Sequence, residues 1–111
     1  MAADPENRRI SVIRHVREEF DLDSMELEEL LRSLRMNVRE LRDNLQRSVK
    51  REERQELAWI GYALQGLGTN LDQGELLELG EALETSAENG RPDELRRLAS
   101  GIDKLLDDLN I

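Results

Sequence analysis

The stretch that decides the fold of this chain is Tyr62-Ala63-Leu64-Gln65-Gly66-Leu67-Gly68-Thr69-Asn70-Leu71. It has the pattern of an amphipathic helix, yet it contains Gly66 and Gly68, and Gly61 precedes it. An interior glycine weakens a helix by roughly 0.5–1 kcal/mol relative to alanine, so these glycines need a steric reason. Helical side chains lean toward the N-terminus, so residue i+4 normally covers residue i. Gly66 covers nothing, and we expect it to leave the side chain of Tyr62 open to a partner.

A second explanation is that the glycines allow two helices to approach closely. For Gly66 the sequence leaves both explanations open. For Gly61 close helix contact is the expected role.

The pattern Tyr-x-Leu-Gln-Gly-x-x-x-Asn-Leu resembles the phosphoacceptor helix of histidine phosphotransfer (HPt) domains. That motif runs His-x-Leu-Lys-Gly and then a short run of small residues that ends in Asn-Leu. The positions that match it are Leu64, Gly66, Asn70 and Leu71. Tyr62 stands at the histidine position and Gln65 at the lysine position, so both departures fall on residues that carry the family's chemistry.

The resemblance continues beyond this helix and covers roughly residues 25–111. A Leu-x-x-Leu-x-x-x-Leu-Glu run follows, and here it consists of Leu76, Leu79, Leu83 and Glu84. A glycine-led turn and a final leucine helix come next, from Gly90 to Leu109.

The resemblance implies the family's fold and binding face, and argues against its reaction. The implied fold is all-α, an up-down antiparallel four-helix bundle over residues 25–111, with an additional N-terminal helix at 5–20, in one domain of residues 1–111. The implied partner-binding face consists of Gln55, Ala58, Tyr62, Gln65, Gly66 and Thr69. A phosphorelay needs a neutral nitrogen nucleophile near pH 7, which histidine supplies. A phenol is protonated at that pH, and its phosphate ester is stable. We therefore expect no catalytic residue and no phosphate transfer at Tyr62.

Composition limits the other functions that this chain could have. It holds 111 residues, of which 37% are charged and 3% aromatic, with a formal net charge of −9. This leucine-rich profile is typical of one helical domain. The acidic balance argues against nucleic acid and anionic membrane surfaces as partners. No cysteine is present, and no apolar run approaches the roughly 20 residues of a membrane span. We expect a soluble, cytoplasmic protein without cofactor, metal or small-molecule substrate.

Hydrophobic periodicity predicts helices over residues 5–20, 24–50, 52–68, 73–88 and 92–109, and no strand. The pairs Asp23/Glu26 and Asp72/Glu75 have capping-box spacing. Gly90 suits a left-handed C-cap.

The same periodicity predicts which side chains face the core. In the first helix these are Ile10, Ile13, Val16, Arg17 and Phe20, and in the second Leu27, Leu30, Leu31, Leu34, Val38, Leu41, Leu45 and Val49. In the third they are Leu57, Ile60, Gly61, Leu64 and Leu67, with Trp59 at the edge of the outer face. In the last two they are Leu76, Leu79, Gly80, Leu83, Ala87, Leu95, Leu98, Ala99, Ile102, Leu105, Leu106 and Leu109.

Two other features of the sequence are candidate sites. A basic row in the second helix consists of Arg32, Arg35, Arg39 and Arg42; it is a solvated flank or a docking patch for an acidic partner. The only histidine, His15, lacks the Gly-x-x-x-Asn-Leu context, so we expect a surface or interhelical residue.

Three functions follow from these observations. The first is an HPt-like signalling module of two-component phosphorelay systems that binds a receiver domain or a histidine kinase without accepting phosphate. The second is a helical scaffold or oligomerisation module with its interface on the basic row or the N-terminal helix. The third is a still-active phosphorelay protein.

Overall fold

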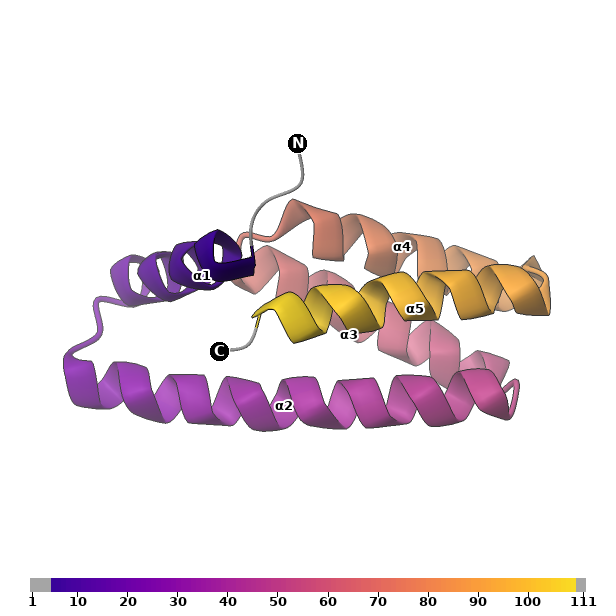
Figure 1. The fold of residues 1–111 in the computed structure, drawn as a ribbon, viewed down its shortest axis with the longest axis horizontal. Coiled ribbons are helices and arrows are strands. Elements are labelled where there is room, and N and C mark those ends of the chain that lie inside the picture. Colours follow the sequence, from indigo (N-terminus) through magenta and orange to yellow (C-terminus); the bar gives the residue numbers. More distant parts are fainter. Residues whose placement is uncertain (1–4, 110–111) are drawn as a thin grey trace.

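The computed structural model describes residues 5–109, with side chains from residue 7 onward. This part of the chain contains helices and no strand, which confirms the all-α class (Figure 1). The helices are α1 (Pro5–Glu19), α2 (Ser24–Lys50), α3 (Arg54–Asn70), α4 (Gly74–Asn89) and α5 (Pro92–Leu109).

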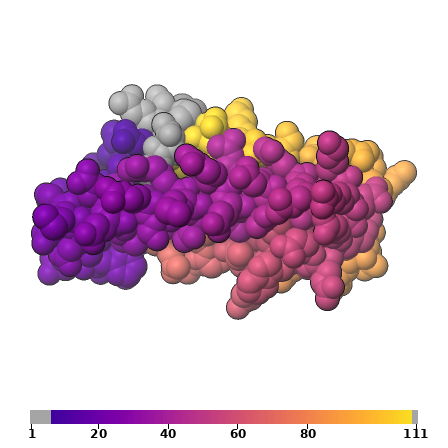
Figure 2. Space-filling view, turned by 90° about the horizontal axis from the view of Figure 1, so that it is seen from below, coloured from indigo at the N-terminus to yellow at the C-terminus, as the bar shows by residue number. Residues whose placement is uncertain are grey.

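The longest helix, α2, sets the length of the molecule. Its 27 residues span about 40 Å at ~1.5 Å per residue, close to the 44 Å long axis. It runs along one side of the protein, and Figure 2 shows it along the length of one face, with parts of α3 and α5 visible at the edges. α2 packs on α3 and on α5, α4 packs on α3 and on α5, and α1 packs on α5. The most extensive of these interfaces joins α3 and α4.

The helix boundaries follow the predicted ones closely. α2 and α5 have the predicted limits, whereas α3 begins and ends two residues later than expected and α4 one residue later. The capping box at α2 is confirmed. Asp23 Oδ1 accepts from the Glu26 N–H at 2.8 Å, and Glu26 Oε1 accepts from the Asp23 N–H at 3.2 Å.

Two predicted caps are wrong. Asp72 adopts a positive φ of 55° in the turn after α3, and Gln73 is the N-cap of α4, without a side-chain hydrogen bond. The short turn needs one residue in the left-handed region, and that requirement removes Asp72 from the capping position. Gly90 is extended, at φ −69° and ψ 155°, because the next helix begins two residues later at Pro92.

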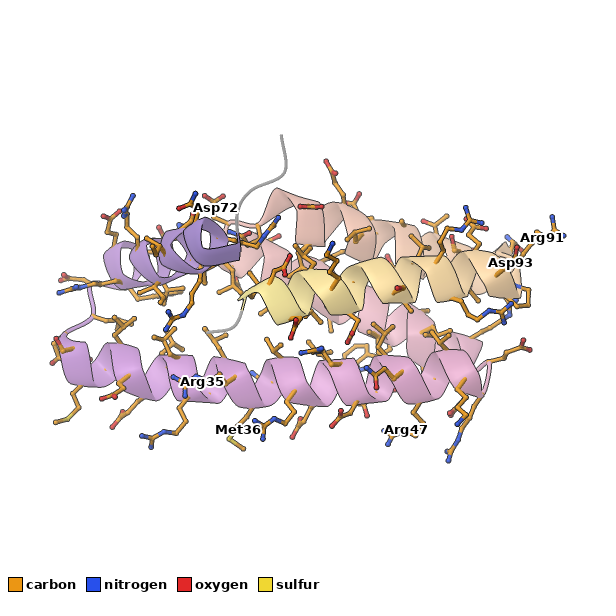
Figure 3. The ribbon with its side chains drawn as sticks, viewed as in Figure 1. Arg35, Met36, Arg47, Asp72, Arg91 and Asp93 are labelled. Carbon is orange, nitrogen blue, oxygen red and sulfur yellow. The ribbon has the colours of Figure 1, made fainter. Side chains whose placement is uncertain are left out.

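The predicted core of the last three helices is largely confirmed. Leu67, Leu79 and Leu98 are half-buried, and the other predicted inward residues of these helices are buried. In α2 only Val38 and Leu45 of the predicted stripe are buried, and the rest of the stripe is half-buried. This helix is longer than each of its neighbours, so part of its apolar face is covered on one side only. The outer face of α2 carries Met36, which points away from the other helices in Figure 3.

The predicted inner face of α1 is partly wrong. Val12 and Val16 are fully buried, Ile13 is half-buried, and Ile10, Arg17 and Phe20 are exposed. Ile10 lies two residues, or about 200° around the helix, from Val12 and therefore faces outward. Phe20 follows the last residue of α1.

One cation of the basic row holds α2 to α5. The Arg42 guanidinium donates through Nε to Asp103 Oδ1 at 2.8 Å and through Nη2 to Oδ2 at 3.4 Å, and Nη1 lies 3.3 Å from Asp107 Oδ1. The hydrogen bond from Arg42 lowers the pKa of the Asp103 carboxyl below its usual value. Arg42 thus serves a structural role, whereas Arg32 and Arg39 are exposed.

Replacing Asp103 by asparagine is expected to lower the free energy of unfolding by about 0.5–1 kcal/mol at neutral pH. A carboxyl whose folded pKa is lowered stabilises the fold above its unfolded pKa of about 4, and that contribution disappears as the pH falls through the folded value. Urea unfolding of both proteins at neutral pH and at about pH 3 checks this. The difference should shrink in acid. Asp107→Asn is the control, because that side chain is 70% exposed and should change stability little.

Candidate docking surface on α3

The outer face of α3 brings together most of the predicted partner-binding residues. Tyr62, Gln55, Thr69 and Gly66 are exposed, and Ala58 is half-buried. They share one face because they are spaced by three, four or seven residues along the helix. Opposite this face, Leu57, Ile60 and Leu64 enter the core. We call the outer face of α3, together with Trp59, the docking face.

An aromatic pair forms the centre of the docking face. The rings of Trp59 and Tyr62 stack with centroids 5.9 Å apart at an interplanar angle of 24°. Each side chain is 61% exposed. With Phe20 these are the only aromatic residues of the chain, and all three lie on the surface while the described core is aliphatic. Exposed aromatic residues with a polar edge are the type most enriched at protein interfaces.

The sequence predicts Trp59 only at the edge of the outer face, whereas the structure places it in the central aromatic pair. Its three-residue separation from Tyr62 places the two rings on adjacent turns of the same helix, which was the available signal.

Gln65 differs from the other face residues because its amide is engaged. Its Nε2 donates to Glu84 Oε1 at 3.0 Å and to the carbonyl of Gly61 at 3.3 Å. The side chain is half-buried and joins α3 to α4 along one border of the docking face. Gln65 therefore fixes the border rather than extending freely into solvent.

The glycines of α3 have two different roles: Gly66 leaves Tyr62 uncovered, whereas Gly61 and Gly68 allow close contact between helices. A Cβ on Gly66 would have no neighbouring atom within 4 Å, so close helix contact is wrong for this residue. A Cβ on Gly61 would lie 2.7 Å from the backbone nitrogen of Glu84, and one on Gly68 would lie 2.7 Å from that of Leu77. Gly61 is thus confirmed as a contact residue, and Gly68 is another.

The missing side chain at Gly66 contributes to a shallow hollow beside Tyr62. The hollow is lined by Tyr62, Ala63, Gln65, Gly66, Thr69, Asn70 and Leu77. The Thr69 hydroxyl donates to the Gln65 carbonyl at 3.0 Å. The hollow lies between α3 and the start of α4.

Reactive groups do not converge on the docking face. His15 is half-buried on α1, which packs on α5, and Tyr62 lies on α3. Within residues 5–109, no cluster of three or more histidine, cysteine or acidic side chains has the arrangement of a metal site. The chemistry that the face offers is aromatic contact, hydrogen bonding and charge.

Comparison of the chain with protein-family models, with curated proteins and with solved structures finds no match. Among the described helices, none combines the length and the apolar character that crossing a bilayer requires.

Proposed function

We propose that this protein is an HPt-like signalling module of a two-component phosphorelay system. It binds a receiver domain or a histidine kinase of the cytoplasm through the docking face and does not itself accept phosphate. The observation that carries the proposal is the exposed Trp59–Tyr62 stack on the helix that has the HPt-like motif. Tyr62 occupies the phosphoacceptor position of that motif.

The proposed fold is an up-down antiparallel bundle of α2, α3, α4 and α5, with α1 as an additional helix. The contacts support it, because each of these helices packs on the next and α5 returns to α2. The turns at residues 51–53, 71–73 and 90–91 are short, and short turns favour antiparallel neighbours.

Absence of phosphate acceptance is the second part of the proposal. At the position where the family has a histidine, Tyr62 presents a hydroxyl. Where the family has a lysine, the Gln65 amide is held by Glu84, so no cation replaces it to attract a phosphoryl group. The face keeps its exposure but lacks both groups that phosphate transfer requires.

Replacing Tyr62 by alanine is expected to weaken binding of a cognate receiver domain or kinase by about 2 kcal/mol, roughly thirtyfold in Kd. Central exposed aromatics contribute this much because they are fully desolvated on binding. Titration calorimetry with purified receiver domains and histidine kinases measures it. Phe20→Ala is the matched control, since it removes an aromatic side chain that is 54% exposed and lies outside the docking face, directly after α1. If the wild type, Tyr62→Ala and Phe20→Ala bound every partner with equal affinity, the docking role of this face would be refuted.

Incubation of the wild type with a receiver domain carrying radiolabelled phosphate tests the second part. We expect no label on this protein. Transfer of label would identify an active phosphorelay protein and overturn our assignment of Tyr62.

An oligomerisation module is the second candidate, and one observation favours it. Further apolar side chains are exposed on α1, on α2 and in the turn between them, namely Ile10, Phe20, Met25 and Met36. Sedimentation of the pure protein separates the two functions, because a stable dimer or larger assembly that persists in Tyr62→Ala would place the interface outside the docking face.

A further inference from the structure

The docking face lies within a segment of the chain whose charged residues are all acidic. Residues 55–90 contain no lysine or arginine. This range covers the docking face, the turn before α4, and α4 itself up to Gly90. Its acidic residues are Glu56, Asp72, Glu75, Glu78, Glu81, Glu84 and Glu88.

Acidic side chains lie on both sides of the aromatic pair. On α3, Glu56 is exposed and stands three residues before Trp59. On α4, Glu84 reaches Gln65, which is three residues after Tyr62. These carboxylates therefore border the aromatic pair from two helices.

A further carboxylate stands on the same ridge of α4. Leu77 lines the hollow beside Tyr62, and Glu84 borders the docking face. Glu81 is four residues after Leu77 and three before Glu84, so it lies on the ridge between them. Glu81 is exposed.

Two cations close to the ends of α3 are engaged in the fold. Arg54, at the start of α3, is half-buried, and its Nη1 donates to the Ala87 carbonyl at 3.4 Å. Arg8 donates to Gln73 and to Glu75 beyond the other end of α3, and its side chain is 10% exposed. Glu56, Glu81 and Glu84 form no ion pair within residues 5–109.

From these charges we infer the chemistry of the partner surface, an inference that rests on the proposed function of the docking face. The occupant of the Trp59–Tyr62 face is a helix or loop of a partner protein with an apolar anchor flanked by arginine or lysine. The apolar anchor covers the stacked rings and the hollow beside Tyr62. The flanking cations pair with Glu56, Glu81 and Glu84, and a guanidinium lying over an aromatic ring adds a cation–π contact. An acidic or neutral partner surface leaves these carboxylates unpaired and is disfavoured.

The protein carries its own reporter for this contact. Trp59 is the only tryptophan of the chain and belongs to the stacked pair. A partner that covers the pair removes water from the indole and shifts its emission to the blue. The probes are two tryptophan-free amphipathic helical peptides with the same leucine face, one flanked by arginines and the other by glutamates.

With the wild type at physiological salt, the arginine peptide is expected to give a saturable blue shift that weakens at higher salt. The glutamate peptide should give none. Glu81→Lys should lower the affinity for the arginine peptide at least tenfold relative to Glu29→Lys. The Glu29→Lys variant makes the same change in net charge at an exposed position near the N-terminal end of α2. Equal affinity in these two variants would show that only overall charge matters and would overturn the inference. A shift that grows with protein concentration in the absence of peptide would also overturn it, because the occupant would be a second copy of this chain.

The same variants distinguish failure of this inference from failure of the proposed function. With a receiver domain or kinase as the partner, loss of binding in Tyr62→Ala but equal binding in Glu81→Lys and Glu29→Lys overturns the cationic partner surface and leaves the docking function intact. Full binding in Tyr62→Ala overturns the docking function itself. Circular dichroism of each variant verifies that the helices are retained.

Discussion

Replacing Gly61 by alanine is expected to destabilise the protein by roughly 1–3 kcal/mol. The added Cβ would lie 2.7 Å from the Glu84 nitrogen and 2.8 Å from the Gly80 carbonyl oxygen. Both are backbone atoms of α4, so neither can move aside without shifting the helix. The steric cost of the added Cβ exceeds the roughly 0.5–1 kcal/mol by which alanine stabilises a helix relative to glycine. Because α3 and α4 form the most extensive interface of the fold, the whole bundle should unfold at a lower urea concentration.

Gly66→Ala provides the matched control on the same helix. Its Cβ would meet no atom within 4 Å, so only helix propensity changes and stability should rise by about 0.5–1 kcal/mol. Gly80→Ala should behave like Gly61→Ala, since its Cβ would lie 2.8 Å from the Gly61 carbonyl oxygen. If Gly61→Ala and Gly66→Ala changed stability in the same direction, the close approach of α3 and α4 would be refuted.

Leu64→Ala is expected to lower the free energy of unfolding by about 2–5 kcal/mol. The side chain is completely buried, and its Cβ faces the Gly80 position of α4. Truncation removes buried methyl groups, and the closely packed α3–α4 interface cannot collapse to fill the space. Urea unfolding followed by circular dichroism measures the loss.

Leu67→Ala is the comparison for Leu64→Ala. Leu67 lies three residues further along α3 and is half-buried, so its truncation should cost no more than about 1–2 kcal/mol. Equal losses at the two positions would contradict the burial that distinguishes them.

The helices themselves were predictable because their signals are local. The limits of α2 and α5, the capping box between Asp23 and Glu26, and the buried stripe of α5 follow from spacing along one chain segment. The predicted caps at Asp72 and Gly90 failed for the opposite reason. Their backbone conformations depend on how the neighbouring helices meet across a short turn, and single-residue preferences do not contain that information.

The docking face was partly predictable in the same way. The exposure of Tyr62 and the steric role of Gly61 follow from helical geometry and from the absence of a glycine side chain. The engagement of Gln65 by Glu84 could not be predicted. Those residues are separated by many positions, and only the packing of α4 on α3 brings them together.

The sequence alone determined the helical class, the order of the helices, the limits of α2 and α5, and which side of each of the last three helices is apolar, because these depend on interactions within a few residues. The tertiary structure decided which face of α1 is buried, that Arg42 joins α2 to α5, and that Glu84 of α4 accepts a hydrogen bond from Gln65 of α3. Each of these depends on contacts between segments distant in the chain. Such contacts form only when the helices pack against one another, and the packing arrangement depends on how all the apolar faces are buried together.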